Sequence, residues 1–311
     1  MTSLICGSLA FDTIMSFPGR FSDAILADQL HKINVAFLTP TMRREYGGCA
    51  GNIAYNLKML GGAPMIMATI GMDGESYLER LADLAISRRH VRTINKSYTA
   101  QAFITTDIDS NQITAFHPGA MALSHQNRIE DIDGPIKLAI VAPDGRDGMV
   151  QNAEDCARLG IPFVFDPGQG LPMFSGQELT RFVDLATYVA VNDYEAEMLA
   201  QTTRLSLTEI ASRVSALIVT RGERGAEIFT DGEKIDIPCV DAEKVVDPTG
   251  CGDAFRAGLM YGLTNGMDMM TSGRLGSLMG ALKIAHQGGQ NHFFAQAEIA
   301  DRFKETFGYR F

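Results

Sequence analysis

Short apolar segments alternate with segments of helical periodicity along most of the chain, and this alternation limits the possible folds more than any other feature. The apolar runs have the length of buried strands and cover residues 4–6, 65–70, 138–142, 162–165, 188–191 and 217–220. Helical spacing lies between most of them, at 52–60, 74–86, 150–159 and 195–201. Repeated strand–helix–strand units give a mostly parallel sheet with helices on both faces. We therefore predict an α/β three-layer sandwich.

Three stretches do not fit this alternation. Residues 12–17, residues 32–38 and the pair 100–106 and 112–116 have extended patterns, but their alternate positions are too polar for central parallel strands. They predict a small separate β-sheet that lies over the main body as a lid, inserted in pieces at about 12–46 and 98–120. The last third predicts helices at 252–263, 269–286 and 296–307. We expect one domain, 1–311, that includes this lid.

Composition excludes several classes of function. The formal net charge of −10 would repel a nucleic-acid backbone, so nucleic acid is not an expected partner. The five cysteines are scattered without a Cys-x-x-Cys pair, which indicates reduced thiols and neither a disulfide framework nor a zinc site. No apolar run approaches the length of a membrane span, and the first residues lack a basic signal region. We expect a soluble, cytoplasmic protein without a permanent metal site.

The turn at 247–258, Asp-Pro-Thr-Gly-Cys-Gly-Asp-Ala-Phe-Arg-Ala-Gly, carries the richest chemistry. Gly250 and Gly252 allow a tight turn before a helix, where consecutive amides and the helix dipole form an anion hole. The carboxylate of Asp253 would repel a phosphate there unless a substrate hydroxyl lies between them and loses its proton to Asp253. A helix cap is the alternative role of Asp253. The turn alone does not decide between the two.

Two common nucleotide motifs are excluded. A dinucleotide fingerprint needs a third glycine where this turn has Phe255, and a Walker loop needs Gly-Lys-Ser/Thr, which the sequence lacks. If ATP binds, it binds without a P-loop lysine.

Four other loops follow predicted strands and permit both functional and ordinary interpretations. Gly47 and Gly48 lead to Asn52 at a predicted helix start, which suits a sugar ring or is an ordinary loop. Asp12 follows the first strand and suits sugar hydroxyls or is a solvated carboxylate. Asn192 and Glu195 suit a hydrated Mg²⁺ ion and a phosphate, or form a capping box.

The fourth loop contains Thr220, Gly222 and Gly225. Its hydroxyl and glycine amides suit a phosphate or ribose, whereas a simple hairpin to 226–230 is the alternative. All these loops fall at predicted carboxyl ends of strands, where this architecture places its ligands.

In this order, these motifs resemble the ribokinase-like (PfkB) family of sugar and nucleoside kinases. Residues 47–52 match its first signature and residues 247–258 its second, with Asn192-x-x-Glu195 and Thr220-x-Gly222-x-x-Gly225 between them. The stretches 7–12, 17–21 and 116–121 are also similar to bacterial adenosine kinases of the mycobacterial type. The resemblance covers nearly the whole chain and implies a ribokinase-like fold.

The resemblance also implies a role for each matched residue. Asp253 would be the base that takes the proton of a 5′-hydroxyl, and Gly250, Cys251 and Gly252 would form the anion hole. The ATP and Mg²⁺ site would include Asn192, Glu195 (Mg²⁺ through water), Thr220, Gly222, Gly225 and Gly252. The nucleoside site would include Ser8, Asp12, Gly48, Asn52, Gln169 and the stacking residues Phe103 and Phe116.

The prediction is therefore an ATP-dependent phosphotransferase that acts on the 5′-hydroxyl of adenosine, because Phe37, Phe103 and Phe116 in the lid segments suit a flat apolar base. A ribokinase- or fructokinase-like sugar kinase is the first alternative, and a non-catalytic nucleoside-binding protein is the second. The resemblance leaves potassium activation open. A homodimer could form through the exposed lid edge.

Overall fold

The computed structural model describes residues 2–25 and 34–311. Within them, nine strands form one sheet in the order β13-β12-β11-β10-β9-β8-β1-β4-β5. Neighbouring strands from β5 to β11 in this order are parallel, and β12 and β13 are antiparallel. The strands are β1 (Thr2–Cys6), β4 (Ala63–Gly71), β5 (Ser87–Ile94), β8 (Ile136–Val141), β9 (Phe163–Phe165), β10 (Tyr188–Asn192), β11 (Ala216–Thr220), β12 (Ala226–Thr230) and β13 (Glu233–Ile237).

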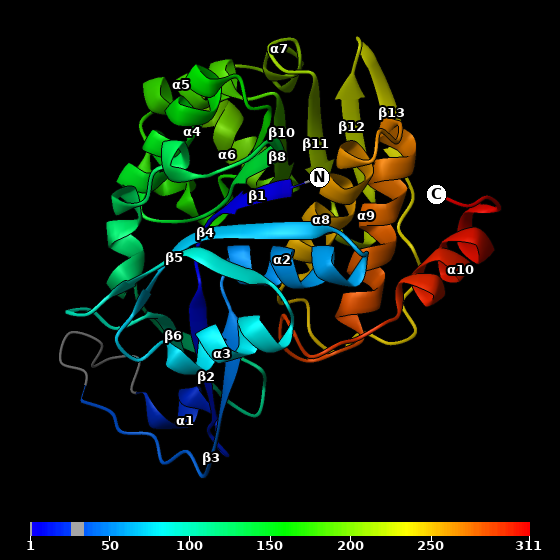
Figure 1. Cartoon of the computed structure of the whole chain (residues 1–311). Helices are drawn as coiled ribbons and strands as arrows, with labels where there is room; N and C mark the ends of the chain where they lie inside the picture. Colours follow the sequence, from blue (N-terminus) through cyan, green and yellow to red (C-terminus); the bar gives the residue numbers. More distant parts are fainter. Residues whose placement is uncertain (1, 26–33) are drawn as a thin grey trace.

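Helices cover both faces of this sheet (Figure 1). One face carries α2 (Cys49–Met59), α3 (Glu75–Asp83), α8 (Cys251–Thr264) and α9 (Met269–Ile284), with α10 (Gln296–Phe307) packed outside them. The other carries α4 (Arg146–Leu159), α5 (Gly176–Leu185), α6 (Asp193–Thr203) and α7 (Leu207–Ala211). Alternation along β1 supplies both cores, because Ile5 packs on the first face while Leu4 and Cys6 pack on the second. The predicted three-layer sandwich is confirmed.

Glycines allow close packing between α8 and α9. A Cβ atom on Gly258 would lie 2.7 Å from the Cα atom of Gly276. No side chain larger than hydrogen fits at this crossing. Helix α10 has the predicted bounds, 296–307.

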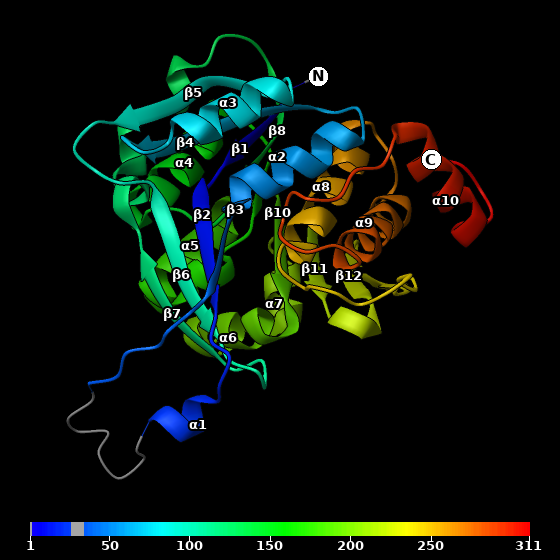
Figure 2. The same cartoon turned by 90° about the horizontal axis from the view of Figure 1, so that it is seen from below.

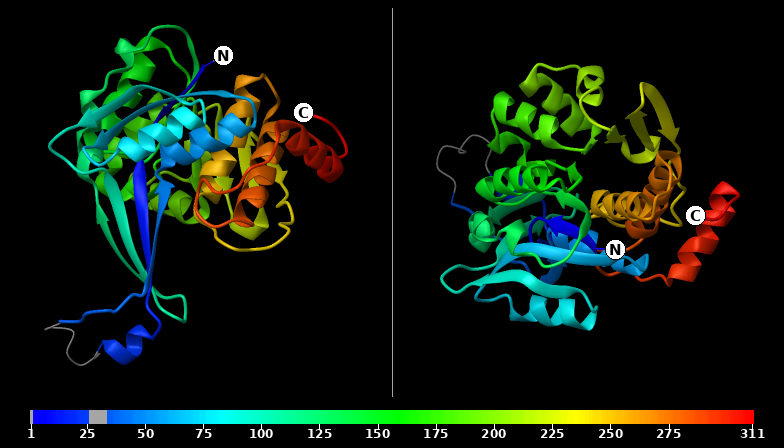
Figure 3. Two further views of the ribbon diagram at one scale, coloured as in Figure 1. Left: turned by 60° about the horizontal axis from the view of Figure 1, so that its bottom comes forward. Right: turned by 45° about the horizontal axis from the view of Figure 1, so that its top comes forward.

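A second sheet extends away from the main body (Figures 2 and 3). Its order is β3-β2-β6-β7, formed by β2 (Ala10–Ser16), β3 (Thr41–Gly47), β6 (Ala100–Thr106) and β7 (Gln112–His117). Strand β2 follows β1 after a short connection, and the four-residue helix α1 (Phe21–Ala24) lies beyond its far end. Short 3₁₀ segments complete the fold at Gly119–Gln126, Ile129–Asp131, Gly168–Met173 and Gly222–Arg224.

Four sequence predictions need correction. Residues 34–38 form no strand, and 32–33 lie outside the described residues. The strand in this part of the lid is β3, which includes Gly47, predicted as a loop residue. The predicted helix 74–86 ends at Asp83, and β5 follows it. Strand β5 was missed because it lies at the sheet edge and its charged residues break any apolar run. Strand β13 was also missed, although the hairpin of β11 and β12 was considered.

Candidate active site

The turn before α8 has the geometry of an anion site. Gly250 adopts a φ of 78°, which favours glycine, and a Cβ atom there would lie 3.1 Å from the Cα atom of Gly289. The Cys251 amide donates to the Pro248 carbonyl at 3.1 Å and so closes the turn. The amides of Gly250 and Gly252 donate to no acceptor in the described part of the chain. A Cβ atom on Gly252 would meet nothing within 4 Å, so the space in front of the helix is open.

Asp253 lies in the first turn of α8, beside this open space. It is not the cap of the helix, because Gly250 holds the cap position and no side chain caps it. The Asp253 Oδ2 atom instead accepts a hydrogen bond from Asn52 Nδ2 at 2.9 Å. Burial, aided by the charge of Asp166, raises the pKa of Asp253 to about 6 against the opposing Asn52 bond. The cap alternative for Asp253 is therefore wrong.

Asn52 does not begin its helix, as predicted, but lies within the first turn of α2, which starts at Cys49. Its side chain is oriented by Gln290, whose Nε2 atom donates to Asn52 Oδ1 at 3.1 Å. Because that oxygen accepts from Gln290, the Asn52 amide nitrogen faces Asp253. Gln290 Nε2 also donates to the hydroxyl of Tyr77 at 2.8 Å, and that hydroxyl donates to the Gly47 carbonyl at 2.7 Å. A chain of buried polar groups therefore fixes Asn52.

Arg256 lies one turn after Asp253 and was not predicted. Its buried guanidinium binds both carboxylate oxygens of Asp166 at 3.2 Å and donates to the Ala190 carbonyl at 3.2 Å. Asp166 directly follows β9, so this bidentate pair ties α8 to the carboxyl ends of β9 and β10. The signal in the sequence is a charged Arg256 within the mostly apolar part of α8 that follows Asp253.

Asp12 reaches the same region from the small sheet. Its carboxylate accepts no hydrogen bond from the described residues, and it lies against Gly47, where a Cβ atom would be 2.6 Å from Asp12 Oδ2. Burial and then the charges of Glu45 and Asp247 raise the pKa of Asp12 to about 6. Gly48, with a φ of 85°, turns the chain into α2, and Ser8 Oγ accepts the Cys49 amide at 3.2 Å.

The strand register separates the two phenylalanines predicted to stack on a base. Ala102 pairs with both Asp12 and Phe116, so Asp12 and Phe116 project from one face of the small sheet. Phe103 is the next residue after Ala102 and projects from the opposite face. Phe103 and Phe116 therefore cannot stack on one base from the same face of the sheet, and the stacking role of either ring stays a prediction. Both side chains are exposed.

Asn192 and Glu195 form the capping box of α6. Asn192 Oδ1 accepts the Glu195 amide, and Glu195 Oε2 accepts the Asn192 amide, both at 2.8 Å. The second carboxylate oxygen of Glu195 has no partner among the described residues. Burial and the charge of Asp166 raise the pKa of Glu195. The capping alternative is confirmed, and one Glu195 oxygen is still available for a ligand.

The remaining predicted residues lie nearby or at the surface. Thr220 pairs with Asn192 across β11 and β10 and begins the hairpin loop. Gly222 and Gly225 have φ values of 56° and 78°, and a Cβ atom on Gly225 would lie 2.1 Å from the Ile237 carbonyl oxygen. Gln169 is exposed in the 3₁₀ segment that follows β9. The strands therefore bring Asn192 and Thr220 side by side, whereas no side-chain hydrogen bond joins Gln169 to either of them.

Within residues 2–25 and 34–311, no group of three or more His, Cys, Asp or Glu side chains could hold a metal ion. In the same ranges, no helix combines the length and apolar character that crossing a membrane requires.

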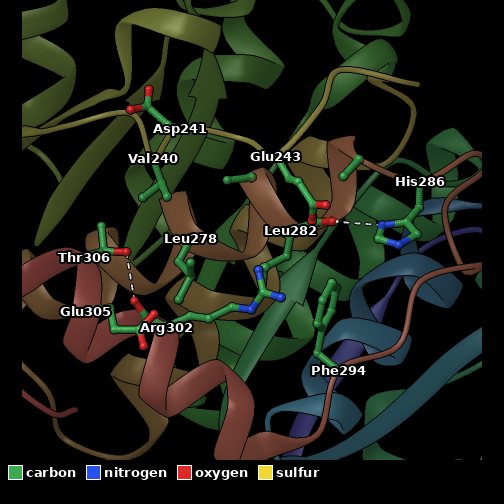
Figure 4. A pocket seen from close by; sticks show the side chains of 12 residues that line it. Val240, Asp241, Glu243, Leu278, Leu282, His286, Phe294, Arg302, Glu305 and Thr306 are labelled. Atoms are coloured by element: carbon green, nitrogen blue, oxygen red, sulfur yellow. Dashed lines mark hydrogen bonds between the residues drawn. The ribbon is translucent and has the colours of Figure 1, made fainter.

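A hollow of about 160 Å³ lies between the 240–243 segment, α9 and α10 (Figure 4). Its lining includes Leu278, His286, Phe294 and Arg302, but none of the predicted site residues. The converging carboxylates and free amides, and not this hollow, mark the candidate active site.

The fold and this site agree with a known family of enzymes. Residues 13–295 match the model of the pfkB family of carbohydrate kinases. The chain therefore belongs to this family. It is a kinase, a phosphotransferase with an alcohol group as acceptor, as its sequence predicted.

Individual proteins of known activity or structure are similar to this chain over most of its length. The nucleoside kinase of Methanocaldococcus jannaschii is 30% identical over 277 residues, which cover 88% of this chain and 90% of that protein. The structure of Burkholderia thailandensis nucleoside kinase in complex with inosine is 58% identical, with a TM-score of 0.90 over 99% of both chains. A ribokinase from Thermotoga maritima, 19% identical with a TM-score of 0.82, shares the fold. The ribokinase-like fold prediction is confirmed.

Proposed function

We propose that this protein transfers a phosphoryl group from ATP to the 5′-hydroxyl of a purine nucleoside, adenosine as predicted and inosine as a second candidate. The observation that carries the proposal is the Asp253 carboxylate, bonded to Asn52 and placed beside the free amides of Gly250 and Gly252. A hydroxyl between this carboxylate and a phosphate can lose its proton as the phosphate arrives. The Burkholderia relative supports a purine nucleoside, because its structures contain inosine and ADP-inosine.

Each residue at the turn has a chemical task in this proposal. Asp253 accepts the hydroxyl proton, and a pKa of about 6 leaves it ionised at neutral pH yet more basic than an ordinary carboxylate. The amides of Gly250 and Gly252, at the positive end of α8, stabilise charge on the transferred group. Asn52 orients the Asp253 carboxylate. The Cys251 amide, which we predicted to join the anion hole, holds the turn by its bond to Pro248.

Magnesium fits the residues on the ATP side of the site. Glu195 keeps one carboxylate oxygen without a partner in the described chain, and hard divalent cations prefer oxygen ligands, often through water. We propose that Glu195 and Asn192 orient a hydrated Mg²⁺ that neutralises phosphate charge when it is bound. Thr220, Gly222 and Gly225 would then line the nucleotide.

The small sheet acts as the lid in this proposal and supplies the contacts to the nucleoside. Asp12 has a carboxylate free to accept ribose hydroxyls, and Phe116 on the same face provides an apolar ring for the base. Ser8, Gly48 and Asn52 complete the ribose side. The exposed edge strand β7 remains a predicted homodimer contact, and the cytoplasmic location remains a prediction.

A substrate panel tests the proposal. Adenosine, inosine, guanosine, ribose and fructose are each incubated with ATP and Mg²⁺, and ADP release is measured. We expect kcat/KM to be highest for adenosine or inosine. Fastest turnover of a free sugar would reject the nucleoside assignment and favour the sugar-kinase alternative.

A matched pair of variants tests the base contact in the same assay. Phe116→Ala removes the ring on the Asp12 face, and we expect KM for the nucleoside to rise by about tenfold, the order of one lost stacking contact. Phe103→Ala removes an exposed ring from the opposite face and should leave KM unchanged. Equal effects of the two variants would contradict the assignment of Phe116.

A further inference from the structure

Lys283 is a buried cation that the proposed reaction does not use. It lies in the last turn of α9 with 0% of its surface exposed, whereas the other lysines of the described chain are exposed or half-buried. Lysine is almost never fully buried without a partner, because desolvation of the ammonium group is costly. Its position therefore needs an explanation.

The partners of Lys283 are backbone carbonyls. Its Nζ atom donates to the Asp247 oxygen at 2.6 Å and to the His286 oxygen at 3.1 Å. No ion pair joins it to a carboxylate of the described residues. The positive charge is therefore not neutralised locally, and burial lowers the pKa of Lys283 while the nearby Cys251, Asp247 and Asp253 oppose that change.

Asp247, the residue that Lys283 contacts, is the anchor of the anion turn. Its Oδ1 atom accepts the Thr249 amide at 2.9 Å and its Oδ2 atom accepts the Gly288 amide at 2.8 Å. Its own amide donates to the Ile284 carbonyl at 3.1 Å. Every polar atom of Asp247 is thus bonded, and the Lys283 ammonium supplies the partner of its carbonyl. From Asp247 the chain passes through four residues to Gly252.

The second acceptor ties the same ammonium to the end of α9. His286 lies on the wall of the hollow beside α9, and its ring contacts the Leu282 carbonyl (Figure 4). Lys283 therefore joins two chain segments, the turn at 247–252 and the residues after α9, through two carbonyl oxygens. Apart from Lys283, the side-chain donor to the Asp247 carbonyl is the weak donor Cys251 Sγ at 3.9 Å. Leaving a buried carbonyl unpaired is costly, so loss of the ammonium should let the turn move.

We propose that Lys283 is a positioning residue for phosphoryl transfer, a built-in cation that fastens the Asp247 carbonyl and so holds the Gly250 and Gly252 amides in place. Two inward carbonyls are also the ligands that a bound monovalent cation would use. With an ammonium group already there, the enzyme should not need potassium. The inference rests on the proposed phosphate-binding role of the turn.

Two substitutions separate a positioning role from mere packing. Lys283→Met keeps the length and volume of the side chain but removes the charge and the donors. Lys283→Ala removes them and leaves space for a small cation. Lys304→Met, an exposed lysine in the last turn of α10, is the matched control. All are assayed for kcat, both KM values and thermal unfolding.

We expect Lys283→Met to lower kcat at least about tenfold with smaller changes in KM, because a displaced turn weakens transition-state contacts most. Lys283→Ala should lose a similar amount and regain about threefold or more with ammonium or potassium chloride, but not with choline chloride at equal ionic strength. Lys283→Met should show no such rescue. The wild type should respond equally to potassium and choline chloride.

Several results would overturn the inference. The first is a folded Lys283→Met variant that keeps the wild-type kcat. The second is a Lys283→Ala variant whose kcat no cation restores. The third is a wild-type enzyme that potassium activates strongly. A wild type that turns over no nucleoside or sugar would instead reject the proposed function. In that case the affinity for ADP is measured by calorimetry on the wild type and on Lys283→Met. Equal affinities would reject the role of Lys283 in positioning the turn at 247–252.

Discussion

Two pairs of helices in this molecule begin in different ways. Helices α5 and α7 start with serine capping boxes, in which Ser175 and Ser206 accept the amide of a glutamate three residues later and the glutamate returns the bond. Helices α2 and α8 start at Gly48 and Gly250. Both glycines have a positive φ, and neither helix has a side-chain cap from its first residue.

The difference concerns the first backbone amides of each helix. A capping box satisfies the first amides of a helix and adds about 1 kcal/mol of stability. A glycine start forgoes that contribution and leaves the amides and the helix dipole unmatched. In α8 these amides face open space, next to Asp253, whereas in α2 the Ser8 hydroxyl takes the first amide. The uncapped start of α8 thus lacks the stability of a capping box and leaves amides free for the anion that we propose binds there.

The strongest test of this comparison is Asp253→Asn. The amide can still accept the Asn52 hydrogen bond but cannot take a proton, so we expect kcat to fall by about 10³-fold, within the range of general-base contributions. Nucleoside affinity, measured by calorimetry, should change little. Asp268→Asn, at the ordinary capped start of α9, should leave kcat unchanged. Near-normal turnover in Asp253→Asn would show that another group is the base.

The glycine start itself is tested by Gly250→Ala. The methyl group would meet Gly289 and force a residue with a φ of 78° into strain, so the turn should shift and kcat should fall by about 10²-fold. Gly266→Ala is the matched control, because Gly266 has a φ of 75° after α8 but nothing within 4 Å of its added Cβ atom. Both variants should lose about 1–2 kcal/mol of stability. Equal loss of kcat in both would indicate global strain and not damage to the turn.

For the candidate site, local patterns in the sequence predicted the geometry of single segments but not the contacts between segments that are distant along the chain. The turn at 247–258 and the capping pair Asn192 and Glu195 are short patterns whose geometry follows from glycine and cap chemistry. The bond between Asn52 and Asp253 joins residues 201 positions apart, and Gln290 reaches Asn52 across 238 positions. Such contacts depend on how α2 and α8 pack, which no local pattern encodes.

The small sheet shows the same limit of local patterns for strands. Its polar alternation predicts β2, β6 and β7, but not β3, whose last residue, Gly47, belongs to a pair of glycines typical of a loop. The opposed faces of Phe103 and Phe116 also require the register with Asp12. A shift of one residue moves a side chain to the other face of a strand. The presence of two phenylalanines in the sequence therefore does not show that Phe103 and Phe116 lie on opposite faces.

The pH dependence of kcat/KM provides the next test, because this ratio reports groups of the free enzyme. The pKa of Asp253 is raised to about 6, and only its ionised form can accept a proton. The rate should therefore rise with pH through about 6 and level off above it, with about a tenfold gain from pH 5 to 7 for one such group. Asp12, with a similarly raised pKa, should make the acid side steeper.

Asp12→Asn separates the two carboxylates. With excess Mg²⁺ held constant, this variant should keep a single titration near pH 6, due to Asp253, while its nucleoside KM rises. A profile that is flat from pH 5 to 7 in the wild type would contradict the raised pKa of Asp253.

The smallest effect should come from the capping box that is also part of the site. Asn192→Ala and Ser175→Ala each remove a cap oxygen, so each should lower the free energy of unfolding by about 1 kcal/mol, measured by urea denaturation. Only Asn192 lies at the end of β10 beside Thr220, with Glu195 near Asp166 and Arg256. We therefore expect Asn192→Ala alone to raise KM for ATP, by a few-fold, the order of one weakened hydrogen bond. If both variants leave KM for ATP unchanged, the Asn192 box is a cap like that of α5, and phosphate binding depends on the uncapped start of α8 alone.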